Sequence, residues 1–66
     1  MQNGIIAGLT DRGFGFIKRE GAEKDLFFHY KDLVNVQFYE LKEGDKVSFD
    51  VEDGEKGPKA IKVSRI

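Results

Sequence analysis

Short runs in which apolar and polar residues alternate dominate this chain, and no run has the period of a packed helix. Val47, Phe49 and Val51 alternate strictly with polar residues, which is the spacing of a strand that buries one of its faces. Four other runs of similar length are bounded by glycine, proline or charged turn residues. The five predicted strands are residues 4–10, 14–19, 25–30, a run that contains 47–51, and 59–66.

Two passages depart from regular alternation. Gly8, near the middle of the first run, predicts a β-bulge or a close approach of another backbone. Residues 31–41 have room for a single helical turn at 32–34, followed by a loop that carries Phe38 and Tyr39.

Five short strands without a substantial helix predict an all-β barrel or sandwich. An immunoglobulin-like sandwich needs about seven strands. The strand count and the length of 66 residues therefore favour a small, partly open, five-stranded antiparallel Greek-key barrel of the OB type, with residues 1–66 as one domain. The predicted core consists of Ile6, Ile17, Leu26, Phe28, Leu41, Val47, Phe49, Val51, Ile61 and Val63.

Composition excludes several kinds of site. The chain has no cysteine and one histidine, so disulfides and thiolate metal sites are excluded, and a zinc site cannot be built from its histidine alone. We expect no metal, no cofactor and no small-molecule substrate. No basic segment followed by an apolar run begins the chain, and no apolar stretch has the length of a membrane span. We therefore expect a soluble, monomeric cytoplasmic protein that is not bound to a membrane.

Aromatic residues concentrate in residues 12–30, which hold five of the eight aromatic residues and the only histidine. If Ile17, Leu26 and Phe28 point inward, strand alternation sends the other set outward on two neighbouring strands. That outward set consists of Phe14, Phe16, Phe27 and His29.

Two other interpretations of these rings remain open. In one the faces are reversed and the rings are core, but reversal would bury Lys18, Asp25 and His29, and an unpaired buried charge costs several kcal/mol. In the other the rings form a protein-binding surface, as exposed apolar patches often do. Gly13 and Gly15 flank Phe14 and leave space for a flat ligand over that ring, although Gly15 is equally explained by packing inside a tight barrel.

Exposed rings favour a nucleic-acid partner. The net charge of −1 argues against a wide basic surface that grips duplex phosphates. Stacking on aromatic rings needs only a local basic rim, and it needs base faces that a duplex hides. We therefore predict a single-stranded partner, with Arg12 and Lys18 on phosphates. Asp25 either accepts a hydrogen bond from a base edge or simply opens its strand after a turn.

His29 is predicted to act as a flat stacking ring, because no serine, cysteine or acid stands in an evident catalytic relation to it. We expect no enzyme activity. Lys31, Lys56 and Lys59 are candidates for the basic rim of the site.

Two segments resemble the ribonucleoprotein motifs of cold-shock domains. The segment Arg12-Gly13-Phe14-Gly15-Phe16-Ile17 is similar to the first motif, and Asp25-Leu26-Phe27-Phe28-His29-Tyr30 is similar to the second. The similarity extends to Phe38 and to residues 41–49 and 56–60, so it covers nearly the whole chain.

The resemblance implies an OB barrel that binds single-stranded RNA and DNA, with a pyrimidine-rich preference in bacterial members and an RNA-chaperone role. It places the stacking surface on Phe14, Phe16, Phe27, His29, Tyr30 and Phe38, and the basic and polar contacts on Arg12, Asp25 and Lys56.

One departure from the family pattern concerns the first strand. Family members usually carry lysine, tryptophan, phenylalanine and asparagine there, whereas this chain has Ala7-Gly8-Leu9-Thr10. The loss of one stacking platform predicts weaker binding, or binding shifted towards Tyr30, Phe38 and Tyr39. It also leaves open an OB domain adapted to protein binding. An RNA-recognition-motif domain is less consistent with the sequence, because it needs two packed helices.

Overall fold

The computed structural model describes residues 2–55 and 57–66, and in these residues the chain forms five strands and two short 3₁₀ turns. All five predicted strands are present, with ends that differ from the expected ones by a few residues. The elements are β1 (Gln2–Leu9), β2 (Phe14–Lys18), β3 (Leu26–His29), η1 (Tyr30–Asp32), η2 (Phe38–Glu40), β4 (Lys46–Gly54) and β5 (Gly57–Arg65).

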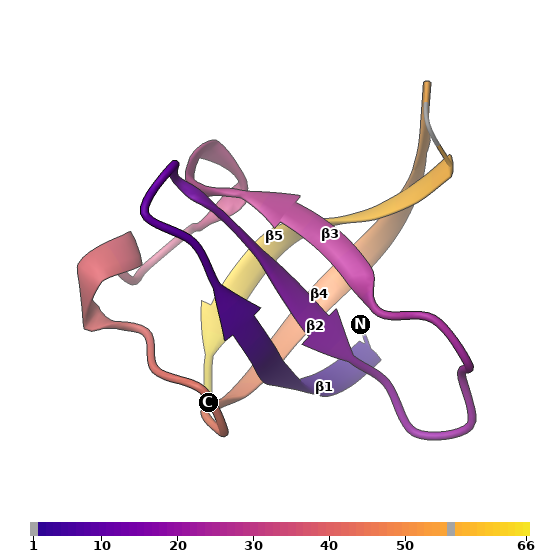
Figure 1. The fold of residues 1–66 in the computed structure, drawn as a ribbon, viewed down its shortest axis with the longest axis horizontal. Helices are drawn as coiled ribbons and strands as arrows, with labels where there is room; N and C mark the ends of the chain where they lie inside the picture. Colours follow the sequence, from indigo (N-terminus) through magenta and orange to yellow (C-terminus); the bar gives the residue numbers. More distant parts are fainter. Residues whose placement is uncertain (1, 56) are drawn as a thin grey trace.

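The strands close into a barrel in the order β1-β2-β3-β5-β4, and β4 returns to pair with β1. Figure 1 shows β1, β2 and β3 side by side, with β4 and β5 crossing behind them. The predicted OB-type barrel is confirmed, but it is closed rather than partly open. One pair, β3 with β5, is parallel. An odd number of strands cannot alternate in direction all the way around a ring, so a five-stranded closed barrel must contain a parallel pair.

The parallel closure between β3 and β5 is short. It consists of the pair Phe27 with Lys59. Just beyond β3, an isolated bridge joins Leu33 to Val63, and the backbone N–H of Val34 donates to the carbonyl oxygen of Val63 at 2.9 Å. The segment that follows β3 therefore extends the closure along β5.

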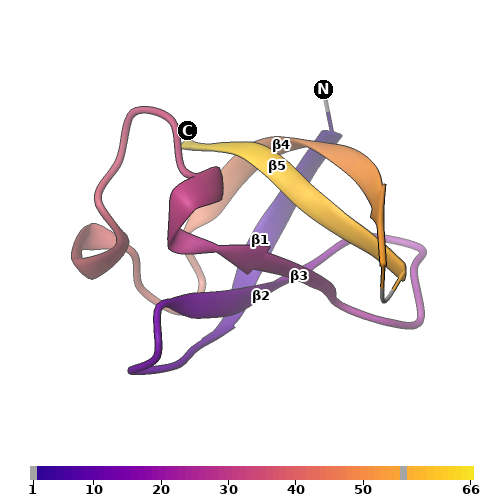
Figure 2. The ribbon, with the colours of Figure 1, turned by 90° about the horizontal axis from the view of Figure 1, so that it is seen from above.

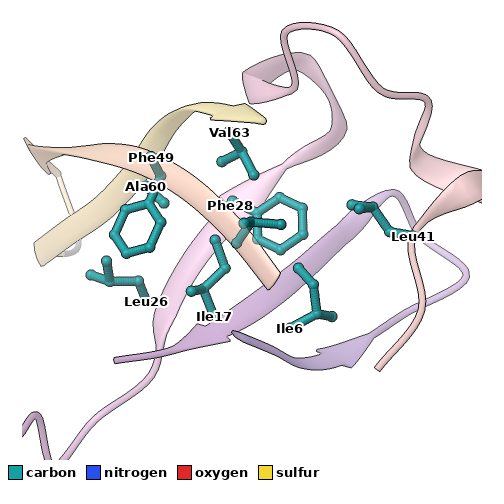
Figure 3. Packing of buried hydrophobic residues seen from close by; sticks show 9 residues of the cluster. Ile6, Ile17, Leu26, Phe28, Leu41, Phe49, Ala60 and Val63 are labelled. Carbon is teal, nitrogen blue, oxygen red and sulfur yellow. The ribbon is translucent and has the colours of Figure 1, made fainter. Parts of the chain in front are cut away.

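The barrel interior is filled by side chains from all five strands and from Leu41 (Figure 3). Eight of the ten predicted core residues are buried, which confirms the predicted inward faces of β2, β3 and β4. The buried hydrophobic residues are Ile6, Ile17, Leu26, Phe28, Leu41, Val47, Phe49, Ala60 and Val63. Val51 is only partly buried and packs against this cluster.

The prediction for β5 is wrong at Ile61. Ala60 and Val63 are buried, whereas Ile61 is only partly buried and lies outside the core cluster. Ser48 pairs with Ser64 and Asp50 pairs with Ile61, so one residue of β4 and two residues of β5 lie between these two registered pairs. The extra residue on β5 is a bulge, and Lys62 within it has a φ of 51°. The bulge shifts the inward positions from Ile61 to Ala60.

The bulge predicted in β1 is present. Ile6 pairs with Ile17 and Gly8 pairs with Phe16, so two residues of β1 oppose one of β2. The predicted close backbone approach is found in the same place. A Cβ atom added to Gly15 would lie 2.8 Å from the carbonyl oxygen of Gly8 and 2.8 Å from the ring of Phe28.

The helical turn predicted at 32–34 is misplaced by two residues. The structure has η1 at Tyr30–Asp32. His29 and Asp32 form a capping box at the start of this turn, and β3 ends at His29. A second turn, η2, forms at Phe38–Glu40, where only a loop was expected. The segment with both turns lies at one end of the barrel, and the β2–β3 loop lies at the other (Figure 2).

The contact between Gly15 and Gly8 leads to a stability prediction with an internal control. Gly15→Ala should lower the free energy of unfolding by about 1–3 kcal/mol, because the methyl group meets backbone and a buried ring. Gly8→Ala should not destabilise the fold, because no atom lies within 4 Å of its added Cβ. Thermal unfolding of both variants tests this. Equal midpoints for the two variants would contradict the close packing at Gly15.

Candidate nucleic-acid interface

Three phenylalanine rings form a cluster on the outer face of β2 and β3. Phe16 pairs directly with Phe27 across the two strands, and Phe14 lies two residues before Phe16. Ring centroids are 5.3 Å apart for Phe14 and Phe27, 6.0 Å for Phe14 and Phe16, and 6.3 Å for Phe16 and Phe27. Phe16 and Phe27 are 36% and 38% exposed. Phe14, Phe16 and Phe27 are called the phenylalanine cluster below.

His29 and Tyr30 continue this surface beyond the phenylalanine cluster. His29 pairs with Phe14, and its ring centroid lies 4.4 Å from that of Tyr30. The backbone N–H of Lys31 donates to Nδ1 of His29 at 3.3 Å. Because Nδ1 accepts this bond, Nε2 carries the proton in the neutral ring and is the nitrogen left to meet a ligand.

Asp32 joins the His29 end of β3 to β5. Its Oδ2 accepts a hydrogen bond from the backbone N–H of His29 at 2.9 Å, and its Oδ1 lies 3.9 Å from Nζ of Lys59. Lys59 is in turn the registered partner of Phe27. One carboxylate therefore links the His29 end of β3 to Lys59 of β5, the residue that pairs with Phe27. This role of Asp32 was not predicted from the sequence, although the spacing of His29 and Asp32 is that of a capping box.

Three charged residues predicted for the site lie at or near the ends of β2 and β3. Lys18 is exposed on the same side of β2 as Phe16, two residues further on, and Asp25 is exposed directly before β3. Arg12 is exposed in the β1–β2 turn, where its backbone N–H donates to Oγ1 of Thr10 at 3.3 Å. Lys56 lies outside the described residues.

Phe38 is placed differently from the other predicted stacking residues. It begins η2, it is partly buried, and its ring centroid lies 6.3 Å from that of the core residue Phe28. Phe38, Tyr30 and Tyr39 line one shallow groove at the end of the barrel. The structure therefore brings Phe38 near Tyr30 but not into the phenylalanine cluster.

The two glycines beside Phe14 serve packing rather than ligand clearance. Gly15 is buried, and an added Cβ would point at Phe28, away from the outer face. Gly13 has a φ of 88°, and an added Cβ would lie 2.8 Å from the ring of Tyr30. The backbone N–H of Tyr30 also donates to the carbonyl oxygen of Gly13 at 2.7 Å. Gly13 thus lets the β1–β2 turn lie against Tyr30.

Other kinds of site are not found in the described part of the chain. No three His, Cys, Asp or Glu residues among 2–55 and 57–66 are grouped so that they could hold a metal ion. Within the same residues, no helix is long and apolar enough to cross a membrane.

A five-stranded closed barrel with exposed rings on one outer face is the architecture of small OB-type proteins that bind single-stranded nucleic acids. The comparison with protein families identifies the group more closely. The family model of the "'Cold-shock' DNA-binding domain" matches residues 2–66. The chain belongs to this family, and the resemblance seen in its two motifs is confirmed. Binding of single-stranded nucleic acid, with an RNA-chaperone-type role, accords with this membership.

Curated relatives cover most of the chain. It is 46% identical over 55 residues to "Cold shock-like protein CspA" of Vibrio cholerae, a match that spans 83% of this chain and 79% of the relative. It is 45% identical to "Cold shock protein ScoF" of Streptomyces coelicolor, over 83% of this chain and 82% of the relative. It is 41% identical to "Major cold shock protein" of Streptococcus pyogenes, over 86% of this chain and 84% of the relative.

Among solved structures, "drosophila Unr CSD456" matches with a TM-score of 0.80 and 30% sequence identity. The match covers 98% of this chain and 26% of the Drosophila chain, so this chain spans about a quarter of that one.

Proposed function

We propose that the outer face of β2 and β3 binds pyrimidine-rich single-stranded RNA or DNA, with bases stacked on the phenylalanine cluster and on His29. The observation that carries this proposal is the exposure of Phe16 and Phe27 beside fully buried neighbours. Phe28 is 0% exposed, whereas Phe27, the preceding residue, is 38% exposed. Rings that the core does not use are available to a flat ligand.

Stacking on this surface gives enough free energy for useful affinity. A base on an aromatic side chain contributes about 1–3 kcal/mol and tolerates any sequence. A micromolar Kd corresponds to about 8 kcal/mol. Three or four stacked bases are therefore of the right order without a strongly basic protein, which fits the net charge of −1.

The remaining predicted residues form the edges of the proposed site. Tyr30 and Phe38 supply rings at the end of the barrel, where both line the same groove. Arg12, Lys18 and Lys56 contact phosphates, and Asp25 accepts a hydrogen bond from a base edge. Residues 1–66 act as one binding domain and as a monomer, and the role is binding without catalysis.

Removing a ring of the phenylalanine cluster should weaken binding without unfolding the barrel. Phe16→Ala and Phe27→Ala should each reduce the affinity for oligo-dT about tenfold, because each removes one stack of about 1–3 kcal/mol. Fluorescence anisotropy measures the affinity, and circular dichroism checks the fold. Phe28→Ala is the matched core variant, and it should lose about 3–5 kcal/mol, comparable to the whole stability of such a domain.

Two outcomes would contradict the proposed site. Unfolding of Phe16→Ala and Phe27→Ala would mean that the rings are core. Folded variants with unchanged affinity would remove the rings from the nucleic-acid site and favour a protein partner for this face.

Gly8 offers a gain-of-function prediction. It pairs with Phe16, and an added Cβ meets no atom within 4 Å. The usual cold-shock-domain pattern has a tryptophan near this position of the first strand. Gly8→Trp should therefore add a stacking ring beside Phe16 and tighten oligo-dT binding by about tenfold, equivalent to one stack. Gly8→Ala is the control and should bind as the parent does. A folded Gly8→Trp variant without a gain in affinity would show that the bound strand does not pass over β1.

A further inference from the structure

Two lysines flank an exposed isoleucine in a row across three strands. Ile5 of β1 pairs with Lys18 of β2 on one side and with Lys46 of β4 on the other. Directly paired residues of neighbouring strands point to the same face of a sheet. All three side chains are exposed, and Ile5 is 46% exposed. The outer surface of the barrel therefore carries a row of cation, apolar side chain and cation.

This row lies in an open groove whose charged side chains are mostly cationic. The groove is lined by Ile5, Ile66, Lys18, Arg19 and Lys46, together with Asn3, Gly4 and Glu20. Three of these side chains are cationic and one is anionic, in a chain whose net charge is −1. Ile66 is held beside Lys46, because its backbone N–H donates to the carbonyl oxygen of Lys46 at 3.0 Å.

The two lysines of the row make no ion pair within the described part of the barrel. Among residues 2–55 and 57–66, no carboxylate lies within ion-pair distance of Lys18 or Lys46. Arg19 makes one long hydrogen bond, from Nη1 to Oε1 of Gln2 at 3.4 Å, and its Nε is buried without a partner in the described structure. The charge of this groove is therefore available to an anionic ligand.

The groove lies next to the phenylalanine cluster along β2. Lys18 follows Phe16 by two residues on β2 and shares its outward face. Two residues of a strand span about 7 Å, so the lysine row lies one step along the barrel from the row that contains Phe16 and Phe27.

We propose that this groove holds the sugar-phosphate backbone of the nucleic-acid strand after it leaves the phenylalanine cluster. Lys18 and Lys46 neutralise two phosphates, and Ile5 contacts the apolar edge of a sugar or base between them. The proposal extends the proposed function from a stacking face to a longer site. The position of the groove next to the stacking face, on the same side of β2, favours a nucleic-acid strand over an acidic peptide, which would match the charge alone.

The test compares a short and a long oligonucleotide at several salt concentrations. An OB fold covers about 4–16 nucleotides, so oligo-dT of about six nucleotides should fill the stacking face, and oligo-dT of about twelve should also reach the groove. Log affinity is plotted against log salt, because the greater number of binding registers on a longer strand raises affinity without changing the slope. The variants are Lys46→Gln and, as a matched control, Lys62→Gln, which removes an exposed lysine of β5 outside the groove.

Lys46→Gln should reduce the slope for the longer strand by about 0.7 unit, the effect of one phosphate contact on a single strand. This corresponds to an approximately fivefold smaller gain in affinity for each tenfold dilution of salt. Binding of the short strand should not change, and Lys62→Gln should match the parent on both strands.

An unchanged slope for Lys46→Gln on the longer strand would overturn the proposal, as would an equal loss in Lys62→Gln. A fluorescent oligo-glutamate peptide is titrated in parallel. Peptide binding that requires Lys46, together with an unchanged oligonucleotide slope, would assign the groove to an acidic peptide instead. Failure of the parent protein to bind the short strand would contradict the proposed function itself, and the groove proposal would fall with it.

Discussion

The pleat of β2 and β3 is the constraint on which the rest of this molecule depends. Neighbouring residues of a strand point to opposite faces, and the interior of a barrel this small accepts only one of the two sets. Ile17, Leu26 and Phe28 fill the interior almost without exposure. Phe16 and Phe27 are then forced outward, and their direct pairing across the strands brings the rings together. The interior packing and the candidate interface are two consequences of one register.

The closure of the barrel determines which strands lie on either side of the phenylalanine cluster. Five strands in a ring require one parallel pair, and here it joins β3 to β5 through Phe27 and Lys59. Asp32 reinforces the junction through its hydrogen bond to the backbone of His29 and its ion pair with Lys59. On the other side, the bulge in β1 places Gly8 opposite Phe16 and leaves open space over that strand. On the β5 side, the phenylalanine cluster is therefore flanked by the ion pair of Asp32 and Lys59. On the β1 side, Gly8 offers no side chain.

Strict alternation made most of the fold predictable from the sequence. In β2, β3 and the first half of β4, the inward residue of each alternating pair is buried. The individual residues whose rings point outward could therefore be predicted from the sequence. Prediction failed where the alternation is broken by a register shift. Because of the bulge at Lys62, Ala60 is buried in the core in place of the predicted Ile61. The sequence has no glycine at this position that would have indicated a bulge. The roles of Gly13 and Gly15 required knowledge of contacts with Tyr30 and Phe28, which are distant in the chain. The groove between Lys18 and Lys46 likewise depends on strand order, because β1 brings β2 and β4 to its two sides.

Base faces, which only a single strand exposes, are what the phenylalanine cluster is proposed to bind. A fluorescence-anisotropy titration with labelled oligo-U, oligo-dT and a duplex of the same length, each at two salt concentrations, tests this proposal most directly. The structure predicts clear binding of both single strands that persists at the higher salt, because stacking is less sensitive to salt than phosphate contacts. It predicts weak, salt-sensitive binding of the duplex. Equal and weak binding of all three ligands would contradict recognition of base faces by this surface.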